Sequence, residues 1–383
     1  MKFLHIADLH IGKRVNEFRM IEDQKWILNQ ILDITDKEKP DGILIAGDVY
    51  DKSQPSAEAV ELLDDFLTKL TVYKKPVFIV SGNHDSPERL GFGSRIMQKH
   101  GLYIAGVFDG TLQKITLEDD YGPVNICLLP FLKPAMVKPF FEQPIETYDG
   151  AVRTVLSDAE IDRQQRNILV AHQFVSYAAQ EPERSDSETL SIGGLDNVDA
   201  SAFDAFDYVA LGHLHGPQRI GRETVRYAGS PLKYSFSEAH HHKSAVLVEL
   251  QEKGSVKFNL LPFLPLHNLR EIRGPMKELI RAGREDSSGS DDYIHATLTD
   301  EEEIYDAIGQ MRQVYPNLMV LDLDNSRSRK ALISQTAASR DDAGKRPLAL
   351  FGDFYRLQNN KELDPEQLRV MEQIFEQAGG ESI

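Results

Sequence analysis

Five short apolar runs, rich in β-branched residues, recur along the N-terminal two thirds of this 383-residue chain and constrain its fold more than any other feature. The runs are FLHIA (3–7), GILIAG (42–47), VFIVSG (77–82), NILVAH (167–172) and YVALGH (208–213). Each is apolar on both faces and bounded by turn residues, which is typical of strands buried inside a sheet. Helical patterns separate the first three runs, so the sequence predicts an α/β body with parallel strands.

Two of the intervening stretches have the 3.6-residue periodicity of amphipathic helices. The expected apolar stripes are Trp26, Ile27, Ile31 and Ile34 within residues 20–36, and Val60, Leu63, Leu67 and Leu70 within residues 56–70. Pro55 and Ser56 suit the start of the second helix, and Pro40 suits a stop after the first. We therefore expect the single tryptophan, Trp26, in the core rather than on a base-stacking surface.

The pattern changes after His215. Residues 225–228, 244–250 and 256–263 predict strands joined by short turns, in an antiparallel meander, so we expect the body to contain two sheets. Near residue 270 it changes again, and the expected elements are helices at 275–284 and 302–312 with strands at 293–299 and 318–323. The polar stretch from about residue 325 to 350 has the composition of a linker, and an amphipathic helix is predicted from Pro365 with Leu368, Met371, Ile374 and Phe375 on one side.

These changes predict four parts of the chain. They are a body (1–270), a small α+β unit (271–325), a linker (326–350) and a C-terminal helical segment (351–383). An amphipathic helix beyond a linker buries its stripe either on a partner protein or on its own body, and we favour the partner.

Charge and cysteine content limit the class of protein. With 43 basic and 60 acidic residues the formal net charge is −17, which argues against a protein that coats nucleic acid unaided, because such proteins gain affinity from a basic face. Bound divalent cations or a basic partner would remove this objection. One cysteine, Cys127, excludes an internal disulfide and a cysteine-rich zinc site, and fits a reduced compartment.

The N-terminal segment MKFLHIADLHIGKR is too polar for a signal peptide, because His5, Asp8 and His10 interrupt its apolar residues. We also find no apolar run long enough to cross a membrane. The expected location is therefore the cytoplasm, without a membrane partner.

Every one of the five runs ends in residue types that bind metals. They are Asp8 and His10, Asp48, Asn83 with His84 and Asp85, His172, and His213 with His215. The carboxyl ends of parallel strands share one edge of a sheet, so these clusters should meet there. The glycines before Asp48, Asn83 and His213 allow tight turns or a close approach of the backbone to a ligand.

Each cluster has a simpler explanation when taken alone. An Asp after a strand is often a turn or helix cap, a single His172 is often a structural histidine, and Asn-His-Asp can form an Asx turn. Five such clusters in a row favour a metal site. Seven oxygen and nitrogen ligands exceed what one zinc ion takes and suit two ions that share a carboxylate. Mn²⁺, Fe²⁺ and Zn²⁺ fit this set better than Mg²⁺, and two such ions favour phosphoester hydrolysis.

In order and approximate spacing, these clusters resemble the five motifs of the calcineurin-like metallophosphoesterases. The segments LHIADLHIG, GDVYD, YAGSPL (227–232) and Phe236-Ser237-Glu238 resemble, more narrowly, the SbcD family of nuclease subunits. This resemblance implies a two-sheet sandwich flanked by helices, with a small α+β capping domain and a C-terminal helical tail. Residues 1–270 would then be the nuclease domain and 351–383 the partner-binding segment.

The resemblance also implies roles for single residues. Asp8, His10, Asp48 and His215 would surround one metal ion, and Asp48, Asn83, His172 and His213 the second, with Asp48 bridging. His84 would contact the scissile phosphate and protonate the leaving oxygen, and Asp85 could hold its ring. The family implies Mn²⁺ as the cofactor, while the ligand chemistry leaves Zn²⁺ and Fe²⁺ open.

The other histidines and the basic residues near the motifs have less specific patterns. We expect His5 to be structural, His100, His267 and His295 to lie away from the site, and His240-His241-His242 to form a polar turn rather than a metal site. Lys13, Arg14, Arg19, Arg89 and Arg95 follow the first and third motifs, and are either DNA contacts or a solvated surface.

Three functions remain to be distinguished. The first is a metal-dependent DNA nuclease (double-strand exonuclease and single-strand or hairpin endonuclease) in DNA repair and recombination. Its implied partners are an SbcC-type coiled-coil ATPase and a second nuclease subunit, in a nucleoid-associated heterotetramer. The second is a protein phosphatase or small-molecule phosphodiesterase, which is weakened because Lys52, and not Arg, follows Asp51. The third is an inactive scaffold, which is weakened because all seven ligand positions are filled.

Overall fold

The structure is a computed structural model that describes residues 1–178, 181–188, 196–285, 291–302, 304–326 and 362–377, with residues 348, 351–352 and 355–356. The chain divides into two compact units. One comprises Met1–Glu271 with Asp291–Tyr293, and the other Ile272–Ser290 with Ile294–Ile383.

Two six-stranded sheets form the first unit. In the order of the first sheet, its strands are β16 (Val256–Pro262), β15 (Ser244–Leu250), β1 (Lys2–Ile6), β4 (Gly42–Ala46), β5 (Val77–Val80) and β6 (Leu102–Ala105). The four strands from β1 to β6 are parallel, and β15 joins β1 in antiparallel pairing. Three of the five predicted runs therefore lie side by side in this sheet.

The second sheet repeats the plan. Its order is β13 (Gln218–Ile220), β14 (Arg222–Tyr227), β12 (Tyr208–Gly212), β9 (Arg166–His172), β8 (Gly122–Leu129) and β7 (Gln113–Asp119). The strands β8, β9, β12 and β14 are parallel, with an antiparallel strand at each edge. Two short pairs, β2 (Arg14–Val15) with β3 (Phe18–Arg19) and β10 (Phe174–Ser176) with β11 (Asn197–Asp199), complete the strands of this unit.

The core lies between the two sheets and on their outer faces. Along β9, Ile168 and Val170 pack in one cluster with Leu44 and Phe78 of the first sheet. The alternate residues of β9 pack on the other side, in the cluster that contains α6 (Tyr148–Asp158). The fully apolar runs are thus explained, because both faces of these strands are buried.

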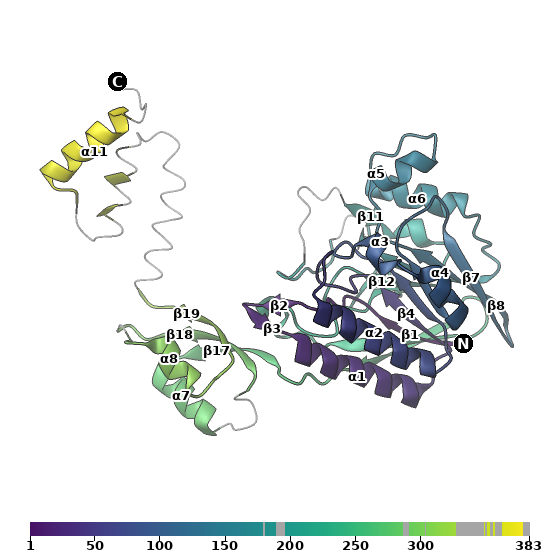
Figure 1. Ribbon diagram of the computed structural model, residues 1–383, viewed down its shortest axis with the longest axis horizontal. Coiled ribbons are helices and arrows are strands. Elements are labelled where there is room, and N and C mark those ends of the chain that lie inside the picture. The colour runs from purple at the N-terminus through teal and green to yellow at the C-terminus, as the bar shows by residue number, and fades with distance from the viewer. Residues whose placement is uncertain are drawn as a thin grey trace. The chain divides into compact units, whose positions relative to one another are not determined.

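Two long helices, α1 (Ile21–Glu38) and α2 (Ala57–Val72), lie side by side against the first sheet (Figure 1). The shorter helices of the unit are α3 (Pro87–Leu90), α4 (Ser94–Met97) and α5 (Pro134–Val137). The predicted start of α2 is confirmed, because Ser56 Oγ accepts a hydrogen bond from the N–H of Ala59 at 3.3 Å. The predicted stop of α1 is also confirmed, since Lys39 ends it in a left-handed conformation.

The predicted position of Trp26 is wrong. Its side chain is 46% exposed, and its Nε1 donates to the carbonyl of Leu264 at 2.8 Å. The buried face of α1 is rotated away from Trp26, because Asp23 and Gln24 are buried there. Asp23 accepts from the hydroxyl of Tyr293, and Gln24 donates to the carbonyl of His10 in the loop after β1. Likewise Val60 is exposed on α2, and Phe66 is buried where the periodicity did not place it.

The predicted meander is only partly correct. The pair β15 and β16 is antiparallel, but β14 pairs in parallel with β12 and belongs to the other sheet. The hairpin of β7 and β8 and the helix α6 were not predicted.

The second unit contains a small α+β core. Its elements are α7 (Met276–Glu285), β18 (Tyr293–Leu298), α8 (Ala307–Arg312) and β19 (Leu318–Leu323), with β17 (Leu269–Gly274) beside β18 in the sheet. The helix α8 begins later than predicted, because the Asp306 side chain caps it at the N–H of Gly309. The predicted linker 326–350 lies, except for Ser326 and Leu348, outside the described residues.

The last described element is α11 (Pro365–Gln377), which begins at the predicted residue. Its exposed apolar side chains include Leu368, Val370 and Ile374. Among the described residues, no helix is both long enough and apolar enough to cross a membrane.

One ion pair, buried at Arg166 and partly exposed at Asp119, joins the edge hairpin to the centre of the second sheet. The guanidinium of Arg166, at the start of β9, binds both carboxylate oxygens of Asp119, at the end of β7. These hydrogen bonds hold the pKa of Asp119 well below its ordinary value. A carboxyl with a depressed pKa stabilises the folded state above its unfolded pKa, and this contribution disappears as the pH falls.

We expect Asp119→Asn to lower the free energy of unfolding by about 1–2 kcal/mol at neutral pH, because Arg166 loses a charged partner. The difference should shrink below about pH 4, where the carboxyl of the unfolded chain is protonated. Urea unfolding of both proteins at pH 7 and pH 3 measures it. A difference that stays constant over this range would contradict the assigned role of the ion pair.

Candidate metal centre

The predicted ligand residues all lie at one end of the two sheets, where the parallel strands terminate. Asp8 and His10 follow β1, Asp48 follows β4, and Asn83 follows β5. His172 ends β9, and His213 and His215 follow β12. The structure therefore brings together all seven residues that the sequence singled out, from both sheets.

The backbone at this end has an uncommon conformation. Asp8, His10, Asp48 and His213 have φ values of 53°, 44°, 46° and 114°. Positive φ is sparsely populated for residues with a side chain and costs about 1 kcal/mol or more each. Hydrogen bonds between the loops help to hold them, since the N–H groups of Asp8 and His10 bind the carbonyls of Gly47 and Asp48 at 3.1 and 2.9 Å.

The three glycines that precede ligands are required by close contacts. A Cβ at Gly47 would lie 2.3 Å from His172 Nδ1, and a Cβ at Gly82 would lie 2.1 Å from Asp48 Oδ1. A Cβ at Gly212 would lie 1.8 Å from the carbonyl oxygen of Ala46, which belongs to the other sheet. The sequence predicted a tight turn or a close approach to a ligand here, and the close approach that these glycines allow is to His172, Asp48 and Ala46 of the chain itself.

One group of potential ligand atoms comes from Asp8, His10, Asp48 and His215. His10 Nε2 lies 3.0 Å from His215 Nε2 and 3.6 Å from Asp48 Oδ2. The ligand atoms of Asp8, His10 and His215 all lie within 4.8 Å of one another. Among the described residues, the buried Asp8 Oδ2 has no hydrogen-bond partner, so this oxygen is available to a cation.

A second group comes from Asn83, His172 and His213. Asn83 Oδ1 lies 2.9 Å from His172 Nε2 and 2.9 Å from His213 Nδ1. His172 Nε2 also lies 3.4 Å from Asp48 Oδ2. Asp48 therefore faces both groups, which is the position of a shared carboxylate.

The second ring nitrogen of His172 is fixed by the backbone. Its Nδ1 lies 2.9 Å from the carbonyl oxygen of Ala46, which can only accept a hydrogen bond. The proton of the neutral ring is thus placed on Nδ1, and the lone pair of Nε2 faces Asp48 and Asn83. Such a contact to the outer ring nitrogen is usual for histidines that bind metals.

Burial sets the charge of most of these rings. Burial lowers the pKa of His213 to about 3 and the pKa of His10 well below its ordinary value. Both are therefore neutral at physiological pH, as metal binding requires. Burial alone would also lower the pKa of His172, but the Asp48 and Asp8 carboxylates raise it to about 9. The neighbouring carboxylates therefore favour positive charge at this point of the site.

His84 lies beside the first group, and its ring is held by a backbone carbonyl. Its Nδ1 is 2.9 Å from Asp51 O, and its N–H donates to Asp48 Oδ1 at 2.9 Å. We expected Asp85 to hold this ring. Instead its carboxylate accepts hydrogen bonds from the N–H groups of Gly82, Val49 and Tyr50 at 2.9, 3.1 and 2.9 Å, so Asp85 shapes the loop.

The predicted DNA contacts have different surroundings. Lys13 is largely buried, and its Nζ binds Asp51 at 2.8 Å, while Arg19 binds Glu58. Arg14 and Arg89 are exposed. A cavity of about 290 Å³ lies beside Asp51, and Lys13, Arg14, Arg19 and Lys52 are among its lining residues.

Several residues that support the site were not predicted. Gln24 of α1 makes two hydrogen bonds to the loop after β1. Its Oε1 accepts from the N–H of Gly12, and its Nε2 donates to the carbonyl of His10. Tyr234 donates to the carbonyl of Leu9 at 2.5 Å. His5 is structural, as predicted, since its Nδ1 lies 2.9 Å from the hydroxyl of Tyr208.

The chain matches known proteins over most of its length. A family model for calcineurin-like phosphoesterases matches residues 1–217, and a model described as the type 5 capsule protein repressor C-terminal domain matches residues 265–359. The SbcD subunit of the SbcCD nuclease of Staphylococcus epidermidis is 37% identical over 326 residues, which are 84% of this chain and 85% of that protein. The chain belongs to the SbcD family of calcineurin-like phosphoesterases. It is therefore a phosphodiester hydrolase that uses divalent metal ions.

Two solved structures are similar at low sequence identity. A dimetal phosphatase from Danio rerio is 13% identical with a TM-score of 0.40, covering 69% of this chain and 99% of that chain. A protein of Thermus thermophilus is 12% identical with a TM-score of 0.39, covering 68% of this chain and 98% of that chain. Similarity at this level bears on neither the substrate nor the reaction.

We expect Gly82→Ala to weaken metal binding by at least about tenfold, because the new methyl group would displace the carboxylate of Asp48. Titration of the purified chain with Mn²⁺ measures the affinity. Gly352→Ala is the matched control, since a Cβ there would meet nothing within 4 Å. Unchanged affinity in Gly82→Ala would show that this contact does not constrain the site.

Proposed function

We propose that this chain is a metal-dependent DNA nuclease, with double-strand exonuclease and single-strand or hairpin endonuclease activity, that acts with an SbcC-type ATPase in DNA repair and recombination. The observation that carries the proposal is the pair of adjacent ligand groups that share Asp48. The relative from Staphylococcus epidermidis, itself named a nuclease subunit, supports the choice of substrate. The alternatives, a protein phosphatase or small-molecule phosphodiesterase, have no comparable support.

The donor set fits two divalent ions. Asp8, His10, Asp48 and His215 would hold one, and Asp48, Asn83, His172 and His213 the other. The unpaired oxygen of Asp8 and the carboxylates that raise the pKa of His172 both favour a cation at this site. We propose Mn²⁺ because carboxylate, amide and imidazole ligands suit it and the family resemblance implies it. When bound, the ions neutralise charge on the phosphoryl oxygens and activate water for hydrolysis.

His84 is the proposed proton donor. Its Nδ1–H is committed to the carbonyl of Asp51, so in the imidazolium form Nε2 carries the transferable proton. That atom would protonate the sugar oxygen as it leaves phosphorus. Asp85 contributes by holding the loop on which His84 lies.

We propose that DNA contacts the basic side chains beside this site. The cavity next to Asp51 contains Arg14 and Lys52, and the carboxylates of Asp51 and Glu58 already pair with Lys13 and Arg19. Arg14 and Arg89 are therefore the better candidates for phosphate contacts than Lys13.

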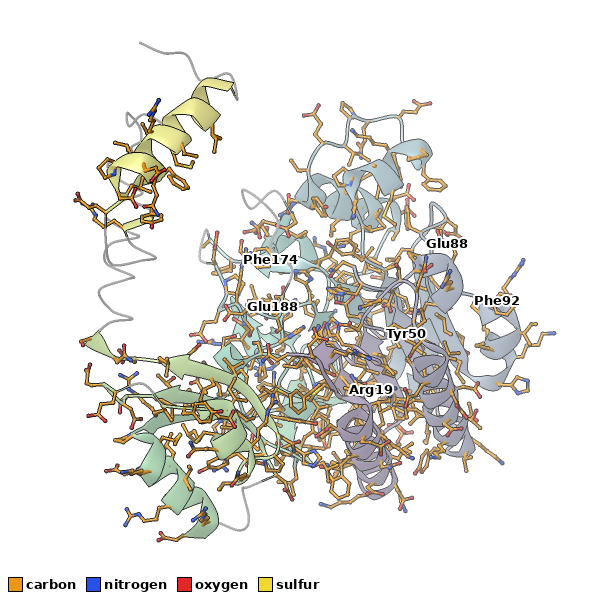
Figure 2. All side chains as sticks on the ribbon, turned by 60° about the vertical axis from the view of Figure 1, so that its left-hand side comes forward. Arg19, Tyr50, Glu88, Phe92, Phe174 and Glu188 are labelled. Atoms are coloured by element: carbon orange, nitrogen blue, oxygen red, sulfur yellow. The ribbon has the colours of Figure 1, made fainter. Side chains whose placement is uncertain are left out.

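The proposed assembly is a heterotetramer of two nuclease subunits and two ATPase subunits, in the cytoplasm and on the nucleoid when bound to DNA. Residues 1–270 would form the nuclease domain, 271–325 the cap, 326–350 the linker and 351–383 the ATPase-binding segment. The exposed apolar face of α11 supports the last assignment. Phe92 is 81% exposed at the edge of the first unit (Figure 2) and is a candidate for the contact between nuclease subunits.

Cleavage of end-labelled duplex DNA by the purified chain with Mn²⁺, with and without the ATPase, tests the function. Hydrolysis of bis-para-nitrophenyl phosphate is measured in parallel. We expect both substrates to be cleaved and both reactions to stop on chelation. Hydrolysis of the small diester with intact DNA under every condition would favour a small-molecule phosphodiesterase.

Two substitutions separate proton transfer from metal binding. We expect His84→Ala to retain both ions and to lose about 10²–10⁴-fold of the hydrolysis rate, because only the proton donor is removed. Asp48→Ala should lose the ions themselves, because Asp48 faces both ligand groups. Mn²⁺ titration and diester hydrolysis are measured on each, with the exposed His100→Ala as the control. Undiminished turnover in His84→Ala would remove this residue from the mechanism.

A further inference from the structure

A buried ion pair lies behind His215, outside all of the metal-ligand motifs. Glu238 ends a short 3₁₀ turn (Phe236–Glu238) and is 0% exposed, and Lys243 is 7% exposed. Lys243 Nζ lies 2.5 Å from Glu238 Oε2 and 2.9 Å from Ser230 Oγ. A buried ion pair often adds little net stability, because the loss of hydration of both charges offsets their attraction.

The ring Nδ1, the N–H and the carbonyl of His215 all contact this pair or its neighbours. Its ring Nδ1 lies 2.6 Å from Ser187 Oγ and 3.4 Å from Glu238 Oε1. Its main-chain N–H donates to Glu188 Oε1, labelled in Figure 2, at 2.7 Å. Its carbonyl accepts from Lys243 Nζ at 2.8 Å. The ring and the backbone of His215 are thus held together.

The direction of the hydrogen bonds determines which ring nitrogen carries the proton. Ser187 Oγ lies 2.5 Å from Glu238 Oε1, and an ionised carboxylate can only accept, so the single hydroxyl proton of Ser187 points to Glu238. The lone pairs of Ser187 are then left to accept from Nδ1–H of His215. The lone pair of the neutral ring is consequently on Nε2, the atom 3.0 Å from His10 Nε2.

Lys243 keeps this chain of hydrogen bonds in one direction. A protonated Glu238 could itself donate to Ser187 and allow the chain to reverse. The ammonium group beside Glu238 Oε2 favours the ionised carboxylate, which cannot donate. The other oxygen of Glu238 also accepts from Ser235 Oγ at 3.1 Å, so the carboxylate is fully engaged.

We propose that Glu238, paired with Lys243, is a positioning residue that fixes the proton of His215 on Nδ1 through Ser187 and so presents Nε2 to the metal ion of the Asp8 group. The inference rests on the proposed function, because it requires His215 to bind an ion. It predicts an effect on one of the two ions only, since the rings of His172 and His213 are oriented by contacts with Asn83 and with the carbonyl of Ala46.

The test is equilibrium Mn²⁺ titration of the full chain, which reports affinity independently of activity. In Glu238→Gln the amide has the same shape but can donate to Ser187, so the hydrogen-bond chain can reverse. We expect one of the two ions to bind about 10–100-fold more weakly and the other to bind as in the unsubstituted chain. Asp119→Asn is the control, because it breaks the partly buried ion pair with Arg166, at the opposite end of β9 from His172, and should leave both affinities unchanged.

A double variant separates positioning from simple stability. Glu238→Gln with Lys243→Met leaves no unpaired buried charge at these two positions, so it should recover the urea stability that Lys243→Met alone loses. Its metal affinity should remain as weak as that of Glu238→Gln. If stability and affinity recovered together, the pair would be structural only. If Glu238→Gln failed to fold, the double variant alone would decide by its affinity.

The outcomes distinguish the two proposals. Failure of the unsubstituted chain to bind any Mn²⁺ would overturn the proposed function itself. Binding of two ions by the unsubstituted chain, with wild-type affinity for both in Glu238→Gln, would overturn only the role of Glu238.

Discussion

The close approach of the two sheets at their carboxyl ends is the constraint on which the rest of this structure depends. At Gly212 the backbone of the second sheet comes so near to Ala46 of the first that a methyl group would overlap its carbonyl oxygen. Only this approach lets His172, His213 and His215 face Asp8, His10 and Asp48. The positive φ values at four of these residues follow from the same crowding, since the chain must turn immediately after each strand.

The buried charges of this site need compensation. The site buries carboxylates and imidazoles close together, and burial of charge is unfavourable unless it is compensated. Asp8 Oδ2 has no hydrogen-bond partner among the described residues, and the Asp48 and Asp8 carboxylates raise the pKa of His172, so a positive charge is favoured here. The outer contacts of His172 with Ala46, and of His215 with Ser187, orient the two rings. The fold therefore holds both the uncommon backbone conformation and the buried charges at this end of the sheets.

The sequence predicts well those parts of the fold and of the site that have a local residue pattern and follow a general rule of sheet geometry. Five apolar runs and the common edge of parallel strands are enough to gather seven residues that are far apart in the chain. Trp26 was misplaced because periodicity alone cannot show that the polar residues Asp23 and Gln24 are buried. Inside the core, Asp23 accepts a hydrogen bond from Tyr293, and Gln24 donates one to the carbonyl of His10. Ser187, Glu188 and Lys243 have no pattern of their own, and their relation to His215 exists only in the folded chain. Asp51 was noticed as part of a motif, but its carbonyl contact with His84 has no sequence signal.

The net charge of −17 limits how this chain can bind a polyanion such as DNA. Near the site, Lys13 and Arg19 are already neutralised by Asp51 and Glu58, so these two cations are not left for phosphate. Two divalent ions would add positive charge at the point where the strands end, and electrostatic attraction in a partly buried site is stronger than in bulk water. Affinity for DNA should therefore depend on metal loading more than on surface lysines. The basic side chains beside the site, such as Arg14, would add to this attraction, and a partner with a basic surface would add more.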